Sequence, residues 1–214
     1  MTFSLSSRTL PNLNCIKIHD SYCDFAPQCA CSKYLNKKSS LKYLGIIIAE
    51  LLTWKDHVEY VTTKIRKLIH KFYELREILD FRTLKTVYFA LTEFVINYGF
   101  AVWGNTSLTT LSKLQVAQKW IIRIMLFKQK RYSSELVFRD SKILNLEQLY
   151  LKSLIRFMMK YDLYKEYLQH GQNTRSPKVC NDVPNSIKRL RYSTVKKELT
   201  RWIIDSQYAI NYVI

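Results

Sequence analysis

The longest regular pattern in the chain is an apolar stripe whose spacing alternates between four and three residues. The stripe comprises Trp54, Val58, Val61, Ile65, Leu68, Phe72, Leu75 and Leu79. This period predicts an amphipathic helix of about seven turns, for which Thr53 is the expected N-cap. The opposite face carries Lys64, Lys67 and Lys71. These three lysines predict either a solvated helix face or a row that contacts the phosphates of a nucleic acid.

Helical spacing of apolar residues recurs further along the chain and predicts four more helices, over residues 82–97, 107–127, 146–168 and 193–206. The positions expected to face inward in the first two are Leu84, Val87, Tyr88, Leu91, Val95, Leu108, Leu111, Leu114, Ala117, Ile121, Ile122 and Met125. Those of the last two are Leu146, Leu149, Ser153, Leu154, Phe157, Met158, Tyr161, Val195, Leu199, Trp202 and Ile203. The chain has only four Gly and four Pro, which also favours helices over a turn-rich β fold.

The residues before these helices follow a different pattern. Residues 16–19 alternate between apolar and polar side chains, which predicts a short strand, and residues 20–40 are expected to form a loop. Residues 41–48 predict a buried strand in which Gly45 marks a bend or a close approach of another group. The expected fold class is therefore mainly α, a helical bundle with a short N-terminal β segment.

These changes of pattern divide the chain into three expected parts. Residues 1–50 hold the N-terminal strands and loop, and residues 51–168 hold the helical part. Residues 169–214 hold a polar break followed by a basic C-terminal helix.

Charge narrows the choice of partner. Lys and Arg number 34 against 17 Asp and Glu, a net charge of +17. Such a field attracts polyanions, so nucleic acid is the first candidate partner, an anionic membrane the second and an acidic protein the third. Two further helix faces carry cations at intervals of four residues. These cations are Lys119 and Arg123 on one helix and Lys152, Arg156 and Lys160 on another.

The cysteines and the apolar runs indicate the cellular compartment in which the protein is expected. The five Cys and the absence of a secretory signal at the start predict free thiols in a reducing compartment, intracellular and either nuclear or cytoplasmic. Residues 44–52 form the most apolar run, which is too short for a membrane-spanning helix, so no transmembrane segment is expected. Of the candidate partners we expect nucleic acid and no membrane. The one zinc candidate has spacing unlike common zinc sites, and its residues are expected to be free of metal. It consists of His19, Cys23, Cys29 and Cys31.

Signatures of catalysis are missing from the sequence. It contains no Gly-rich phosphate loop, no nucleophile elbow and no HExxH motif. Phosphoryl transfer with two metal ions needs clustered carboxylates, and the sequence has no adjacent pair of Asp residues. We therefore expect no catalytic residue and no metal site in this chain.

A series of short motifs resembles the region of non-LTR retrotransposon reverse transcriptases that follows the palm, in particular in jockey-like elements. The series begins with KYLG at residues 42–45 and LTWKDHV at residues 52–58. It continues with Tyr98–Gly99, Val102–Asn105, Leu114–Arg123, Asn173–Arg175 and Val183–Ile187. The resemblance covers nearly the whole chain from about Lys42.

The resemblance implies a role in holding template and primer. The KYLG strand of that family belongs to the primer grip, which makes Tyr43, Leu44 and Gly45 primer-grip-like here. The helices that follow form a thumb and a connection region, so a thumb-like bundle is expected. The candidate contacts to the nucleic-acid backbone, inferred from helix faces, are Lys64, Lys67, Lys71, Lys119, Arg123, Lys152, Arg156 and Lys160.

In the same family the catalytic carboxylates of the palm and the YxDD turn lie upstream of KYLG. The resemblance therefore implies a truncated RNA-directed DNA polymerase that is inactive alone, with Mg²⁺ expected only together with the missing palm. The implied partners are RNA, DNA or an RNA–DNA hybrid, and the remainder of the polymerase. The alternatives are a helical protein-interaction module, in which the Trp54–Leu79 stripe is a coiled-coil seam, or a decayed copy without activity.

Overall fold

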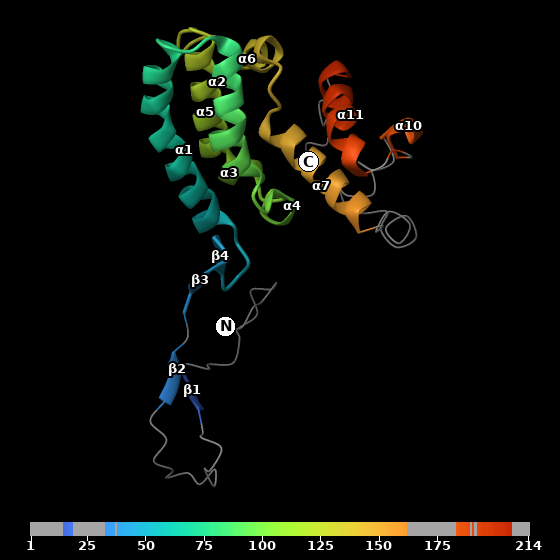
Figure 1. Ribbon diagram of the computed structural model, residues 1–214. Helices are drawn as coiled ribbons and strands as arrows, with labels where there is room; N and C mark the ends of the chain where they lie inside the picture. Colours follow the sequence, from blue (N-terminus) through green and yellow to red (C-terminus); the bar gives the residue numbers. More distant parts are fainter. Residues whose placement is uncertain are drawn as a thin grey trace. The chain divides into compact units, whose positions relative to one another are not determined.

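The structure is a computed structural model that describes residues 15–18, 33–36, 38–161, 183–188, 190 and 192–206. It divides into two compact units, residues 1–58 and 59–214, and each is described by itself. The described chain is mainly helical and has a short β segment near its N-terminus, which confirms the expected fold class (Figure 1).

The first unit contains two antiparallel pairs of strands. Strand β1 (Cys15–Ile18) confirms the expected short strand, and it pairs with β2 (Lys33–Asn36). The prediction of an uninterrupted loop over residues 20–40 was therefore wrong. The second pair, β3 (Ser40–Tyr43) and β4 (Ile46–Ala49), places Leu41 opposite Ile48.

Residues 41–48 thus form a hairpin and not the single buried strand that was expected. The chain reverses at Leu44 and Gly45, whose φ angles are 46° and 83°. Positive φ at both central residues is what a type I′ hairpin turn requires. The predicted bend at Gly45 is confirmed. Leu41, Tyr43 and Leu44 are exposed, so this hairpin is less covered than a core strand would be.

The start of helix α1 (Lys55–Arg76) is tied to this hairpin. The first helical hydrogen bond runs from the Val58 N–H to the carbonyl of Trp54, so Thr53 is not the N-cap. His57, in the first turn of α1, is buried, and its Nδ1 accepts a hydrogen bond of 3.2 Å from the Ile47 N–H. A backbone donor of β4 is thereby satisfied by a side chain.

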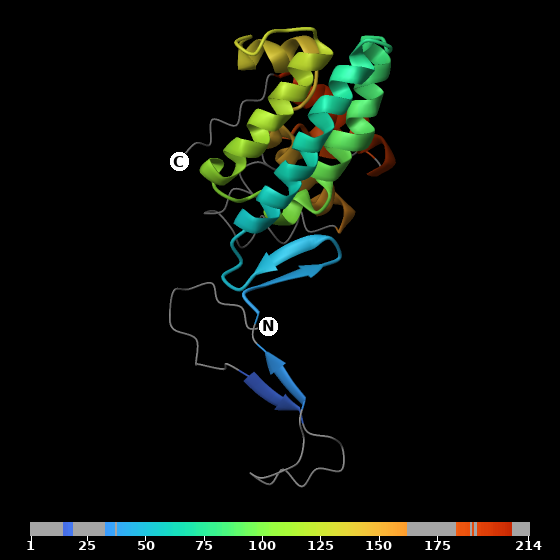
Figure 2. The same cartoon turned by 90° about the vertical axis from the view of Figure 1, so that its left-hand side faces the viewer.

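The second unit is a bundle of helices (Figures 1 and 2). After α1 come α2 (Phe81–Tyr88), a π-helical turn η1 (Phe89–Glu93), α3 (Phe94–Asn97), α4 (Phe100–Trp103), α5 (Leu108–Met125), α6 (Ser134–Ser141), α7 (Leu146–Lys160), α10 (Asn185–Lys188) and α11 (Tyr192–Asp205). In both views α1, α2 and α5 run side by side. None of the helices in the described parts of the chain is long and apolar enough to cross a membrane.

The predicted apolar stripes account for much of the core. Val61, Ile65 and Phe72 of α1 are buried, as are Leu111, Leu114, Ala117, Ile121, Ile122 and Met125 of α5. Val195, Leu199 and Ile203 of α11 are buried as well. Leu108 is an exception, because it is exposed at the first position of α5.

The register predicted for residues 82–97 fails after Tyr88. The π turn η1 closes with a hydrogen bond from the Phe94 N–H to the Phe89 carbonyl, five residues apart. The extra residue in this turn rotates the helix face that follows. Leu91, expected inside, is exposed, whereas Thr92 and Glu93 are buried.

Helix α7 is covered on more than one side. It contacts both α4 and α11, so its buried arc is wider than one stripe and includes Leu151, Lys152 and Ile155. Phe157 and Tyr161 were expected inside and are exposed. The expected continuation of this helix beyond residue 161 lies outside the described residues.

The VWGN motif has a packing role. Trp103 is fully buried, and its Nε1 donates a hydrogen bond of 2.8 Å to the Tyr98 carbonyl. Gly99 has a φ of 65° where α4 begins. A Cβ at Gly104 would lie 2.5 Å from the Tyr150 ring and 2.6 Å from the Phe100 carbonyl oxygen, so the side chain must be absent here.

A polar network lies inside the bundle. Gln118 is fully buried, and its Nε2 donates hydrogen bonds of 2.9 Å to the Tyr88 hydroxyl and to the Leu144 carbonyl. Burial raises the pKa of Tyr88 far above its ordinary value. The network links α2, α5 and the segment before α7, and it stabilises one arrangement of the three.

Candidate nucleic-acid interface

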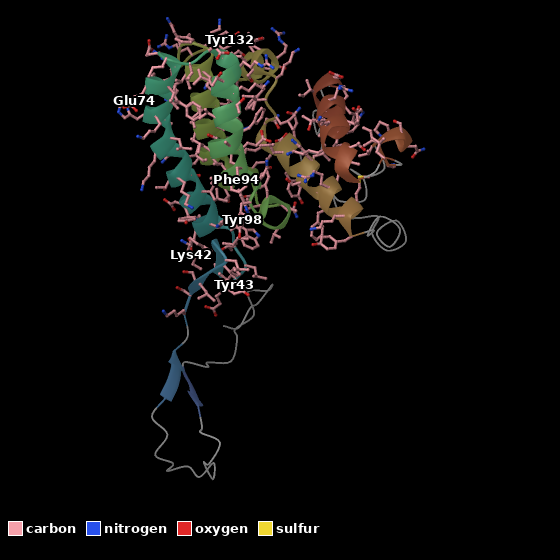
Figure 3. All side chains as sticks on the ribbon, in the orientation of Figure 1. Lys42, Tyr43, Glu74, Phe94, Tyr98 and Tyr132 are labelled. Carbon is pink, nitrogen blue, oxygen red and sulfur yellow. The ribbon has the colours of Figure 1, made fainter. Side chains whose placement is uncertain are left out.

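The lysine row of α1 lies on an open helix face. Lys64, Lys67 and Lys71 are all exposed, and within the described part of the chain none of them forms an ion pair. The Lys64 Nζ lies 4.5 Å from the centre of the Tyr60 ring. Glu74, which Figure 3 labels, points away from the other helices and marks this face at the end of the row.

The row is regularly spaced. Positions i, i+3 and i+7 lie on one side of a helix, and the rise of 1.5 Å per residue spreads them over about 10 Å. Glu74 lies at the end of the row and pairs with His70 at 3.2 Å, and no ion pair among the described residues joins it to the three lysines. A cationic face of this kind can follow the phosphates of one strand.

The cations of α5 have a different role. The Arg123 guanidinium donates to the Tyr132 carbonyl through Nε at 3.0 Å and through Nη2 at 2.8 Å, and it reaches the Ser134 hydroxyl at 3.3 Å. Burial lowers the pKa of Lys119, and the nearby charge of Arg123 lowers it further. Arg123 therefore holds the loop between α5 and α6, and both cations are only partly accessible.

The three cations of α7 do not share one exposed face. Lys152 is buried, and its Nζ lies 3.6 Å from the Glu93 Oε1. Arg156 is half-buried. Lys160 is exposed, with its Nζ 5.2 Å from the centre of the Tyr161 ring. Their even spacing along the helix did not reveal that α11 and η1 cover part of this face.

The primer-grip-like residues form the tip of the β3–β4 hairpin. Leu44 is 71% exposed although it is apolar and has a positive φ. Tyr43 beside it is also exposed, as Figure 3 shows. Neither core packing nor turn propensity explains why a leucine occupies position 44, because Asn or Gly would suit this turn position better.

A basic and aromatic loop between α5 and α6 was not predicted as a site. Phe127 has a φ of 54° and is 60% exposed. It follows α5 in a Schellman arrangement, in which its N–H bonds to the Ile124 carbonyl and the Lys128 N–H bonds to the Arg123 carbonyl. Glycine is the usual residue at such a position, so an exposed Phe there costs backbone strain without a gain in packing.

Cations surround this loop. The guanidinium of Arg76, at the end of α1, lies 5.1 Å from the centre of the Phe127 ring. Lys128 lies 5.0 Å from the Tyr132 ring, and Lys130 lies 5.8 Å from the Trp120 ring. The sequence signal that could have revealed the loop is the run FKQKR at residues 127–131, which contains three cations and no acid.

No candidate metal centre joins these surfaces in the part of the chain that the structure describes. Within that part, no group of three His, Cys, Asp or Glu residues is placed to hold an ion. The residues of the zinc candidate, His19, Cys23, Cys29 and Cys31, lie outside the described residues.

The chain shares weak sequence similarity with a known protein. Over 142 residues, which is 65% of this chain, the sequence is 22% identical to a Drosophila melanogaster protein described as "Probable RNA-directed DNA polymerase from transposon X-element". The match spans 16% of that protein's length. No family model matches the chain, and no solved structure matches it. The similarity supports a relationship to transposon RNA-directed DNA polymerases.

Proposed function

We propose that this chain is the thumb and connection part of a reverse-transcriptase-related polymerase and that it binds the sugar-phosphate backbone of RNA, DNA or an RNA–DNA hybrid. The observation that carries the proposal is the exposed row of Lys64, Lys67 and Lys71 on α1, which has no ion-pair partner among the described residues. The similarity to a transposon polymerase supports it independently.

Two other features supply further candidate contacts in this proposal. The α5–α6 loop offers Phe127 beside Lys128 and Arg76, a combination suited to base stacking and phosphate contact. The β3–β4 tip offers the exposed Tyr43 and Leu44, which would act as a primer grip in this proposal. In this proposal Arg123 and Lys152 act through the fold and do not contact the nucleic acid.

The test compares two variants with the same change of charge. Fluorescence anisotropy of a labelled duplex measures affinity over a range of salt for Lys67→Gln with Lys71→Gln, and for the control Lys113→Gln with Lys197→Gln. Each phosphate contact contributes about −0.9 to the log–log salt slope on duplex DNA, so the first variant should flatten the slope by about 1.8. The control lysines are exposed on other helices, and their loss should leave the slope nearly unchanged.

Equal slopes for the two variants would contradict a role for the α1 row. Undetectable binding of the unmodified chain at low salt would refute the nucleic-acid proposal as a whole and would favour a protein-interaction module. A template–primer extension assay separates binding from catalysis, because we expect this chain to bind the substrate without extending it.

A further inference from the structure

A cleft of about 590 Å³ lies within the helical unit, away from the α1 row. Residues of η1 and α3 line one part of it, and residues of α7 and α11 line another. Clefts of roughly 300–1,000 Å³ commonly hold small ligands. This cleft is large enough for a single nucleotide unit.

The cleft is strongly cationic. Lys142, Lys152, Arg156 and Lys196 line it, whereas Glu93 is its single acidic lining residue. Burial lowers the pKa of Lys152, and although Glu93 raises this pKa, the charges of Lys196 and Arg156 lower it further. Cations that repel one another in this way gain stability when an anion lies among them.

Glu93 adds a hydrogen-bond acceptor to this cationic cleft. The Glu93 Oε1 lies 3.6 Å from the Lys152 Nζ and accepts a hydrogen bond of 3.3 Å from the Asn97 Nδ2. The Glu93 Oε2 is buried and has no hydrogen-bond partner among the described residues. A buried acceptor of this kind favours a ligand that brings an N–H donor. A simple inorganic anion has no such donor.

The π turn is the reason that this carboxylate faces the cleft. The extra residue of η1 rotates the helix so that Glu93 is buried and Leu91 is exposed. π-Helical turns within α-helices occur frequently at functional sites. A regular α-helix would have placed a leucine inside and no carboxylate.

Aromatic rings complete the cleft. Phe94 is 68% exposed, and Tyr98 and Phe89 are exposed as well, although all three are large and lie at the cleft. Figure 3 labels Phe94 on α3 and Tyr98 just after it. Exposed rings beside cations are the usual means of holding an unpaired base and its phosphate.

We propose that this cleft binds a nucleotide, with its phosphate at Lys142, Arg156 and Lys196, its base against Phe94 and Tyr98, and an amino group of the base donating to the Glu93 Oε2. The nucleotide can be free or part of a single strand, since both present the same groups. The site is separate from the α1 row, so either can exist without the other.

The probe for this site is a 5′-fluorescein-labelled tetranucleotide of deoxycytidine, whose anisotropy reports binding to the full chain. To remove binding at the α1 row, the measurement is repeated in a background of Lys64→Gln, Lys67→Gln and Lys71→Gln. Persistent binding in this background that Lys196→Gln weakens supports the cleft even if the proposed function fails. Loss of all binding in this background would overturn the cleft proposal and leave the α1 row standing.

Two lysines that are neighbours on α11 provide the matched comparison. Both side chains are exposed, but Lys196 lines the cleft and Lys197 does not. A lost charge-assisted contact predicts about tenfold weaker binding for Lys196→Gln and no change for Lys197→Gln. Equal affinities of the two variants would overturn the proposal, and a circular dichroism spectrum confirms that both are folded.

Competition identifies the ligand. Displacement of the probe by cytidine monophosphate indicates that a free nucleotide suffices, and displacement only by the unlabelled tetranucleotide indicates a strand segment. Equal displacement by inorganic phosphate at matched ionic strength would overturn the nucleotide assignment. The deoxycytidine probe should bind more tightly than a thymidine probe, because only cytosine carries an exocyclic amino group. Equal affinity would overturn the role of Glu93.

Discussion

The buried pair of Glu93 and Lys152 allows the sharpest test of the fold around the cleft. The side chains of Lys152 and Glu93 are 9% and 10% exposed, and the Lys152 Nζ lies 3.6 Å from the Glu93 Oε1. At this distance and an effective dielectric constant of about 20, the attraction between the two charges is roughly 5 kcal/mol. Removing one partner leaves the other charge buried and uncompensated, which costs about 3–5 kcal/mol.

The two single variants should differ. Glu93→Gln leaves Lys152 facing the charges of Arg156 and Lys196 without a carboxylate. Lys152→Met leaves Glu93 with cations still nearby, among them Lys85, whose pKa Glu93 raises. We therefore expect Glu93→Gln to lower the free energy of unfolding more. The double variant should cost less than the sum, with a coupling of about 2–3 kcal/mol.

The pH dependence of the free energy of unfolding provides a second test of the same pair, because its direction can be predicted. The pKa of Lys152 in the folded protein lies below its ordinary value of 10.5, first because of burial. Between these two pKa values the unfolded chain binds more protons than the folded one, so stability rises with pH up to about 10.5. Loss of Glu93 lowers the folded pKa further, so the penalty of Glu93→Gln should shrink as the pH rises from 7 to 9.

Urea unfolding of the four proteins at both pH values measures these quantities. Lys160→Met is the control, because Lys160 is exposed on the same helix and its replacement should change the free energy of unfolding by less than about 0.5 kcal/mol. Additive single variants, or a Glu93→Gln penalty that grows with pH, would refute the paired and desolvated state of Lys152.

Three further substitutions test the packing and the strain. Gly104→Ala should lower the free energy of unfolding by about 1–3 kcal/mol through overpacking against the backbone of Phe100, and an unchanged urea midpoint would contradict this. Gln118→Leu should cost about 2 kcal/mol because the buried Tyr88 hydroxyl loses its donor; a neutral result would show that the network is dispensable. Phe127→Asn should raise the free energy of unfolding by about 1 kcal/mol by relieving strain and should weaken nucleic-acid binding, and greater stability with unchanged affinity would exclude a binding role for the ring.

The elements that the sequence predicted well are those whose apolar stripe faces a single neighbouring layer. Helices α1, α5 and α11 bury residues of the expected stripes because one face of each lies against the bundle. The prediction of α7 was poorer because α4 and α11 contact it on different sides. A helix covered on two sides buries more than a period of 3.6 residues reveals, and Lys152 was therefore placed on the wrong face.

Local backbone geometry explains the other differences. The π turn η1 adds one residue to a helical turn, and no apolar spacing in the sequence signals such an insertion. The β3–β4 turn has Leu44 in a position that usually carries Asn or Gly, so the usual hairpin signal was missing. Helix α6 is short, with only Val137 and Ser141 buried, and it offers too little periodicity to be recognised.

The candidate site was predictable where exposure follows directly from the helix period. The open positions of Lys64, Lys67 and Lys71 follow from the buried stripe on the opposite face of α1. The cleft could not be predicted in the same way, because it depends on the rotation of Glu93 by the π turn and on α11 lying beside α7. Contact of either surface with nucleic acid is a prediction for experiment.

The residues that carry the likeness to reverse transcriptases act mostly within the fold. Trp103 and Gly104 pack α4 against its neighbours, Gln118 joins three segments, and Arg123 holds the α5–α6 loop. The side chains of Trp103, Gln118 and Arg123 form hydrogen bonds within the fold, and Gly104 has no side chain. A chain can therefore keep the motifs and the fold and still lose its binding surfaces. Substitutions at these four positions should therefore reduce stability and binding together, whereas substitutions in the α1 lysine row should reduce binding alone.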